Sequence, residues 1–180
     1  IALALAIPGE AVMGLVGPNF VGGTGALAFL LAAEAVAATA VVSESALVYI
    51  ARHRNLLISL SMLLLQAALS VAFIQISLYM GWGPLFQAAA VAAALMVALA
   101  YASVVKAIFL SKLLGAPVNG WRSTLLIAVA VASAIGYLAT NLPEWAELIV
   151  GIPMILGSYA WVIWKWGFGP EDRKLFKMKG

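Results

Sequence analysis

The chain has 180 residues, of which 65% are hydrophobic and only 9% are charged, and its formal net charge is +3. Soluble domains carry about 25% charged residues, so this composition excludes a water-soluble fold and predicts that the surplus apolar surface lies in lipid. With no cysteine and a single histidine, His53, the sequence also excludes disulfides and a thiolate or multi-histidine metal site.

Six apolar segments approach or exceed the about 20 residues that a spanning helix needs. They cover residues 1–17, 24–51, 55–80, 84–114, 121–140 and 144–166, and short turns separate them. The segments lack the period-2 alternation of a β-barrel. We therefore predict an all-α, polytopic bundle of six transmembrane helices over residues 1–168, followed by a basic cytoplasmic tail at 169–180. Because the chain begins with Ile1 inside an apolar run, the first helix is expected to be truncated.

The first segment contains Pro8-Gly9, followed by Glu10. A proline inside a helix removes a backbone hydrogen bond and bends the helix. Glu10 could then line a cavity at the break or begin the resumed helix, and the sequence favours neither alternative. The last segment contains Gly151-Ile152-Pro153, which predicts a second bend.

Two carboxylates lie within the second segment. Glu34 is ten residues past Thr24, near the middle of a spanning helix. A charge at that depth costs about 2.5–3.5 kcal/mol on insertion scales. We interpret Glu34 as a carboxylate that lines a substrate cavity or couples transport to an ion; the alternative is a neutral side chain bonded to a neighbouring helix. Glu44 lies two turns before a basic loop, where it could pair with a cation in a structural role.

A polar stripe runs along one face of the third segment. Its members are Ser59, Gln66, Ser70 and Ser77. The stripe is expected to face other helices or water. In the fourth segment, Lys106 allows two interpretations. The segment is longer than the hydrocarbon is thick, so the ammonium could extend to the headgroups; or it could face the bundle interior, where it would bind a substrate phosphate or pair with Glu44.

Nine of the ten Lys and Arg residues fall on one side if the six segments alternate in direction. They are Arg52, Arg54, Lys112, Arg122, Lys165, Arg173, Lys174, Lys177 and Lys179. Because cytoplasmic loops are enriched in Lys and Arg, this side and the C-terminus are expected in the cytoplasm. Cations confined to helix ends set orientation, so no nucleic-acid partner is expected.

Catalytic signatures are missing from the sequence. It contains no phosphate-binding loop, no H-E-x-x-H motif and no G-x-S-x-G motif, and its single aspartate, Asp172, offers no paired metal site. We therefore expect no enzyme, no catalytic residue, no metal and no cofactor. The candidate residues for substrate binding or coupling are Glu10, Glu34, Glu44, Gln66 and Lys106.

Two stretches resemble a known family. The run Gly14-Leu15-Val16-Gly17-Pro18-Asn19-Phe20, leading into Gly25-Ala26-Leu27-Ala28-Phe29-Leu30-Leu31, resembles the C-terminal half of polysaccharide flippases. These belong to the multidrug/oligosaccharidyl-lipid/polysaccharide exporter superfamily. The tail Gly169-Pro170-Glu171-Asp172-Arg173 is similar to a Pro-x-Asp-Arg ending in many such flippases.

The resemblance implies a transporter of two six-helix lobes that rock around a central cavity. This chain would be the C-terminal lobe, and its partner would be the N-terminal lobe of the same polypeptide. The implied substrate is a lipid-linked glycan, such as a lipopolysaccharide precursor, moved across a bacterial inner membrane. Two alternatives stay open: an ion-coupled multidrug antiporter with Glu34 as the coupling carboxylate, and a non-transporting membrane subunit that only packs against a partner.

Overall fold

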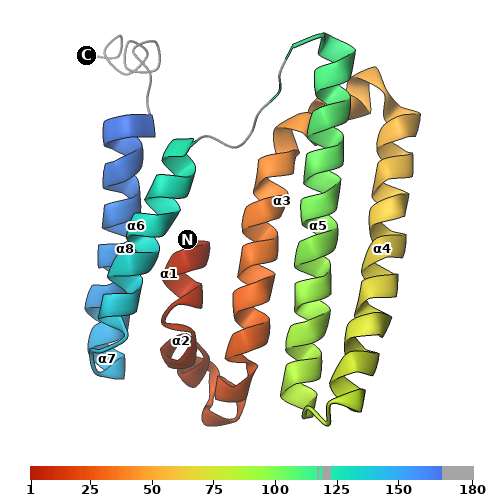
Figure 1. Ribbon diagram of the computed structural model, residues 1–180. Coiled ribbons are helices and arrows are strands. Elements are labelled where there is room, and N and C mark those ends of the chain that lie inside the picture. Colours follow the sequence, from red (N-terminus) through yellow and green to blue (C-terminus); the bar gives the residue numbers. More distant parts are fainter. Residues whose placement is uncertain (117, 119–122, 168–180) are drawn as a thin grey trace.

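The structure, a computed structural model, describes residues 1–116, 118 and 123–167, and these form helices and turns with no strand among them (Figure 1). In chain order the elements are α1 (Ala2–Ala6), α2 (Gly9–Val16), η1 (Pro18–Gly23), α3 (Thr24–Ile50), α4 (Arg52–Tyr79), α5 (Pro84–Leu114), α6 (Ser123–Ala139), α7 (Glu144–Ala146), η2 (Glu147–Gly151), α8 (Ile152–Val162) and η3 (Ile163–Gly167). Of the short elements, η1 is a 3-10 helix, whereas η2 and η3 are π-helical. The expected tail at 169–180 lies outside the described residues.

Four helical stretches are long and apolar enough to cross a membrane. They are Pro18–Val41, Arg52–Tyr79, Pro84–Leu114 and Glu144–Gly167. At about 1.5 Å per residue, even the shortest, with 24 residues, exceeds the about 30 Å of bilayer hydrocarbon. These lengths fit the all-α membrane protein that the composition predicts. The bounds of α3, α4, α5 and the last stretch agree with the expected segments to within three residues.

The first expected segment, residues 1–17, is not a continuous helix. It divides at Pro8 into α1, with five residues, and α2, with eight. Pro8 has no N–H to donate, and its ring collides with the carbonyl one turn earlier. The fifth segment forms α6, whose 17 residues extend about 25 Å. The described residues therefore give four continuous spans, and the number six stays a prediction.

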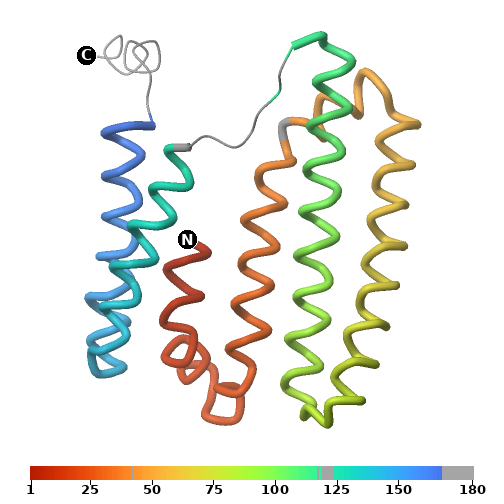
Figure 2. The backbone as a smooth tube through the Cα atoms, in the orientation of Figure 1, coloured from red at the N-terminus to blue at the C-terminus, as the bar shows by residue number. Residues whose placement is uncertain are grey.

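The helices form two groups that α1 and α2 join (Figures 1 and 2). In one group α5 packs against both α3 and α4, and in the other α6 packs against α8. Between them, α1 contacts α3 on one side and α6 and α8 on the other. Successive long helices run antiparallel, so the α3–α4 turn, the end of α5 and η3 share one end of the molecule. The α4–α5 turn and α7 lie at the opposite end.

Alanine dominates the buried surface of the larger helix group. The buried alanines are Ala33 and Ala40 in α3 and Ala92, Ala94, Ala98 and Ala102 in α5. Membrane helices gain little from the hydrophobic effect when they associate, so close backbone approach and dispersion hold them together. A second buried cluster, formed by Ala4, Ala132 and Ile155, joins α1 to α6 and α8. Small side chains thus set the spacing in both groups.

Apart from Lys106 within α5, the positive charges of the described residues gather at one end of the molecule. Arg52 and Arg54 begin α4, Lys112 lies in the last turn of α5, and Lys165 lies in η3. All four positions belong to the end that carries the α3–α4 turn (Figure 1). Arg122 and the four cations of the tail lie outside the described residues. The described part of the charge pattern is therefore consistent with the orientation expected from the sequence.

Candidate functional site

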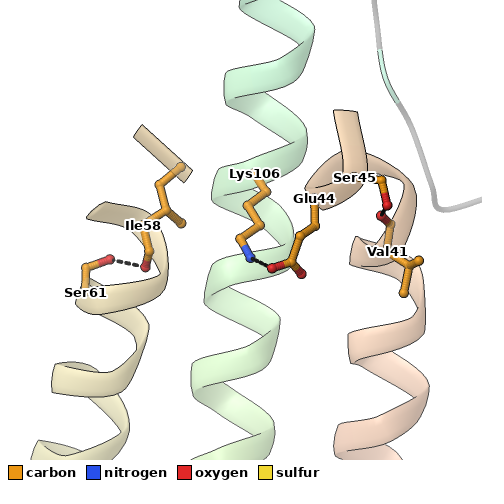
Figure 3. Close-up of polar contacts among 6 residues, drawn as sticks. All are labelled: Val41, Glu44, Ser45, Ile58, Ser61 and Lys106. Atoms are coloured by element: carbon orange, nitrogen blue, oxygen red, sulfur yellow. Dashed lines mark hydrogen bonds and ion pairs between the residues drawn. The ribbon is translucent and has the colours of Figure 1, made fainter. Parts of the chain in front are cut away.

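The polar centre of the larger helix group is an ion pair between α5 and α3. Lys106 shares a face of α5 with Ala98, Ala102 and Leu110, each four residues from the next. It is only 4% exposed. Its Nζ lies 3.0 Å from Glu44 Oε1 on α3 (Figure 3). The ammonium therefore turns into the bundle and does not extend to the headgroups. The sequence left open whether Lys106 extends to the headgroups or faces the bundle interior. The structure shows it in the interior, paired with Glu44.

The two partners of this pair differ in accessibility. The Lys106 side chain is 5% exposed, whereas the Glu44 side chain is 48% exposed. A buried ammonium needs a compensating anion in contact with it, and Glu44 provides one. The open side of the pair is therefore the side of Glu44. The pair thus joins an enclosed cation to a half-exposed carboxylate.

A second polar contact joins α3 and α5 close to the ion pair. Thr39 Oγ1 and Ser103 Oγ are 2.9 Å apart. The Thr39 hydroxyl donates to the Val36 carbonyl at 2.6 Å, so the Ser103 hydroxyl is the donor between the two side chains. Sequence reasoning missed both residues. A usable signal was present, since Ser103 lies three residues before Lys106 and therefore on the same helical face.

The polar stripe of α4 lies on a partly buried face of the helix, where the sequence allows contact with other helices or with water. Ser77 is buried, and Ser59, Gln66 and Ser70 are half-buried on a helix that packs against α5. Gln66 nevertheless lies far from the ion pair. Ser61 Oγ lies 3.3 Å from Tyr101 Oη, and the two helices are antiparallel. From that contact Gln66 and Lys106 lie five residues away in opposite directions, a separation of about 15 Å along the axes.

The other two carboxylates lie apart from the ion pair. Glu34 is exposed on α3, ten residues and about 15 Å before Glu44. Its neighbours Ala35 and Ala38 line a cavity of about 310 Å³ among α1, α3, α6 and α8. Glu10 is exposed in the first turn of α2, where the helix dipole favours a negative charge. Of the five candidates, the structure brings together only Glu44 and Lys106.

Glu147 is a buried carboxylate near the turn between α6 and α7, and it is not among the five candidates. It is 9% exposed and begins the π-helical turn η2, which precedes Pro153 in the first turn of α8. Without an N–H, Pro153 cannot continue the regular hydrogen-bond ladder, which accounts for the altered winding at the predicted bend. Glu10 and Glu144 are close enough to interact electrostatically with Glu147. No three His, Cys, Asp or Glu side chains within the described ranges could hold a metal ion.

The arrangement between α3 and α5 therefore offers one buried cation, one half-exposed carboxylate and two hydroxyls. Such a set suits the binding of an anion. Comparisons of the chain with protein-family models, with curated proteins and with solved structures find no match. The functional argument accordingly rests on the residues and their geometry.

Proposed function

We propose that this chain is one lobe of a membrane flippase. It moves a lipid-linked oligosaccharide or polysaccharide precursor across a bacterial inner membrane by alternating access, opposite a second lobe of the same polypeptide. In this proposal six segments cross the membrane, and the end that carries Arg52, Arg54, Lys112 and Lys165 faces the cytoplasm together with the C-terminus. The observation that carries the proposal is the contact between buried Lys106 and half-open Glu44.

The ion pair supports a two-state mechanism for an anionic substrate. A lysine buried among apolar helices is stable when an anion contacts it, and losing that anion is costly. A diphosphate of a lipid carrier would replace Glu44 at Lys106 when the substrate enters, and Glu44 would return when it leaves. A ligand shifts a conformational equilibrium only by binding one state better than the other. The replacement of Glu44 by the substrate diphosphate at Lys106 would provide this difference in binding between the two states, and it requires no covalent chemistry.

The helix arrangement supports motion between the two helix groups. They are joined through α1 and α2, which are separated at Pro8, and the second group has a π-helical turn before Pro153. Transporters use discontinuous helices at the places where bundles move. The cavity that Ala35 and Ala38 help to line lies between the two groups. It gives the groups room to change their packing.

The test is transport in proteoliposomes that contain this lobe together with its opposing lobe. A fluorescent oligosaccharide on a polyprenyl diphosphate is supplied in one leaflet, and its arrival in the other is measured with a quencher. Lys106→Met removes a charge-assisted contact, which is worth about 1.5–3 kcal/mol, and should slow transfer about 10- to 150-fold. Lys112→Met, at an exposed lysine of the same helix, is the matched control and should transfer at the wild-type rate. Equal rates for both variants would refute the proposal.

A second candidate function rests on Glu34. Its exposed position in the middle of α3, beside the residues that line the 310 Å³ cavity, favours an ion-coupled multidrug antiporter. In that case Glu34→Gln should stop ion-driven drug export while Lys106→Met leaves it intact. If Glu34→Gln leaves the transport phenotype unchanged but abolishes binding to a partner, the chain is instead a non-transporting packing subunit.

A further inference from the structure

A second cavity lies at the end of the bundle opposite the basic residues. It has a volume of about 320 Å³ and opens where α3, α4 and α5 meet the α4–α5 turn. Four aromatic side chains form its walls, namely Phe29, Phe73, Trp82 and Phe86, and alanines of α5, including Ala90, form its floor. The rings of Trp82 and Phe86 are 5.7 Å apart between centroids. The cavity is therefore an apolar slot.

The position of the slot corresponds to the membrane interface. Ser77, which also lines it, lies two residues before the end of α4 at Tyr79. Trp82 lies in the turn that follows, and tryptophan is enriched at the level of lipid headgroups. The surrounding helices are long enough to span the membrane. Any lipid acyl chain that enters this slot from the bilayer therefore has its ester group and its first methylenes near Ser77.

Ser77 provides an independent indication of a ligand. It is 1% exposed, and its Oγ has no hydrogen-bond partner among the described residues. Buried hydroxyls normally have a partner, because an unmade hydrogen bond in an apolar site is unfavourable. Rotation of this side chain toward the slot would let its O–H donate to an acceptor at the base of an entering chain.

We propose that the slot holds one acyl chain of a phospholipid from the leaflet at this end, with its ester carbonyl accepting a hydrogen bond from Ser77. The apolar walls exclude a headgroup. The volume is near the lower end of the about 300–1,000 Å³ typical of small-molecule sites, so it accommodates part of one chain and not a whole lipid. This binding is independent of the substrate that the protein transports, because the slot and the Lys106–Glu44 pair lie at different ends.

The first experiment counts tightly held phospholipid. The protein is purified in mild detergent, incubated with diacyl phosphatidylglycerol, stripped of loose lipid and examined by native mass spectrometry. Ala90→Leu fills the floor of the slot and should lose one phospholipid per chain relative to wild type. Ala72→Leu, at an exposed alanine of α4, is the matched control and should retain it. If both variants lose the phospholipid alike, the lipid is ordinary annular lipid and the proposal is wrong. If both variants retain it, the slot does not hold the lipid and the proposal is also wrong.

The second experiment leaves the shape of the slot almost unchanged. Wild type should prefer diacyl phosphatidylglycerol to its dialkyl ether, which lacks the carbonyl, by about 2- to 10-fold, the effect of one hydrogen bond. Ser77→Ala should abolish this preference. Equal binding of both lipids by wild type, or an unchanged preference in Ser77→Ala, contradicts the proposal. If polyprenyl phosphate displaced the bound phospholipid more strongly than the diacyl lipid does, the slot would bind a polyprenyl chain. That result would also contradict the proposal.

Discussion

A lysine ammonium among apolar helices is stable only when an anion lies against it. In the Lys106–Glu44 pair the lysine depends on its partner more than the glutamate does, because the two side chains differ in exposure. Lys106 is enclosed by α5 and α3, whereas almost half of the Glu44 side chain is exposed. Loss of the anion leaves a charge that cannot reach water. Loss of the cation leaves a carboxylate that can turn outward. The two halves of one ion pair therefore contribute differently to stability.

This asymmetry gives a prediction for single substitutions at the pair. Glu44→Gln should lower the free energy of unfolding by about 3–5 kcal/mol, as expected when one partner of a buried pair is removed. Lys106→Met should lower it by clearly less. The measurement is reversible unfolding in mixed detergent micelles.

The double variant separates this explanation from a general loss of packing. In Glu44→Gln/Lys106→Met no buried charge stays behind, so most of the stability lost in Glu44→Gln should return. Strictly additive losses in the double variant would show that the two side chains are not coupled and would contradict the prediction.

At the scale of helices, length and apolar composition predict the long elements well, and prolines modify the rest. The bounds of α5 agree with expectation at both ends, since Pro84 fits the first turn and Gly115, with φ 63°, ends the helix in a left-handed conformation that glycine tolerates. Pro8 divides the first expected segment into two helices too short to span a membrane. Sequence reasoning expected this proline to bend the helix, and left open only whether Glu10 lines a cavity at the break or begins the resumed helix.

The candidate site was less predictable than the helices because it depends on which faces meet. Periodicity placed Lys106 and Glu44 on known turns of known helices, but the register between α3 and α5 decides whether they touch. Small residues such as Ala98 and Ala102 allow many registers, so the sequence left both interpretations of Lys106 open. The sequence likewise shows no sign that Glu147 is buried, since η2 packs against α2, α6 and α8, and those contacts are not encoded in its local sequence.

Packing of α1 against α6 depends on a glycine and can be tested with a matched pair. A Cβ atom at Gly136 would collide with Ile7 of the α1–α2 connection and lie 3.2 Å from Ile155, whereas one at Gly157 meets nothing within 4 Å. Gly136→Leu should therefore destabilise the protein by about 1–3 kcal/mol through overpacking. Gly157→Leu should be neutral or stabilising, because leucine favours helix. Thermal unfolding of both variants in detergent is the measurement, and equal effects would show that α1 does not depend on Gly136.

Apart from Lys106, which is paired inside the bundle, the whole molecule places its described cations at one end, and the aromatic α4–α5 turn lies at the other. Arg54 is also held in place there, since its guanidinium lies 5.1 Å from the centre of the Phe109 ring. Moving these cations through the hydrocarbon would be costly, so we expect the protein to insert in one direction only. The natural absence of cysteine makes this direction directly measurable with single introduced thiols.

Labelling of such thiols in sealed membrane vesicles should divide the chain into two sets. His53→Cys and Lys112→Cys, at the basic end, should react only with reagent on the cytoplasmic side, because the positive charge of their loops keeps them there. Trp82→Cys and Asn141→Cys, at the opposite end, should react only from the other side. Labelling after the vesicles are permeabilised controls for thiols that are buried. If positions 53 and 82 were labelled from the same side, α4 would not cross the membrane. That result would also contradict the orientation on which the proposed direction of transport depends.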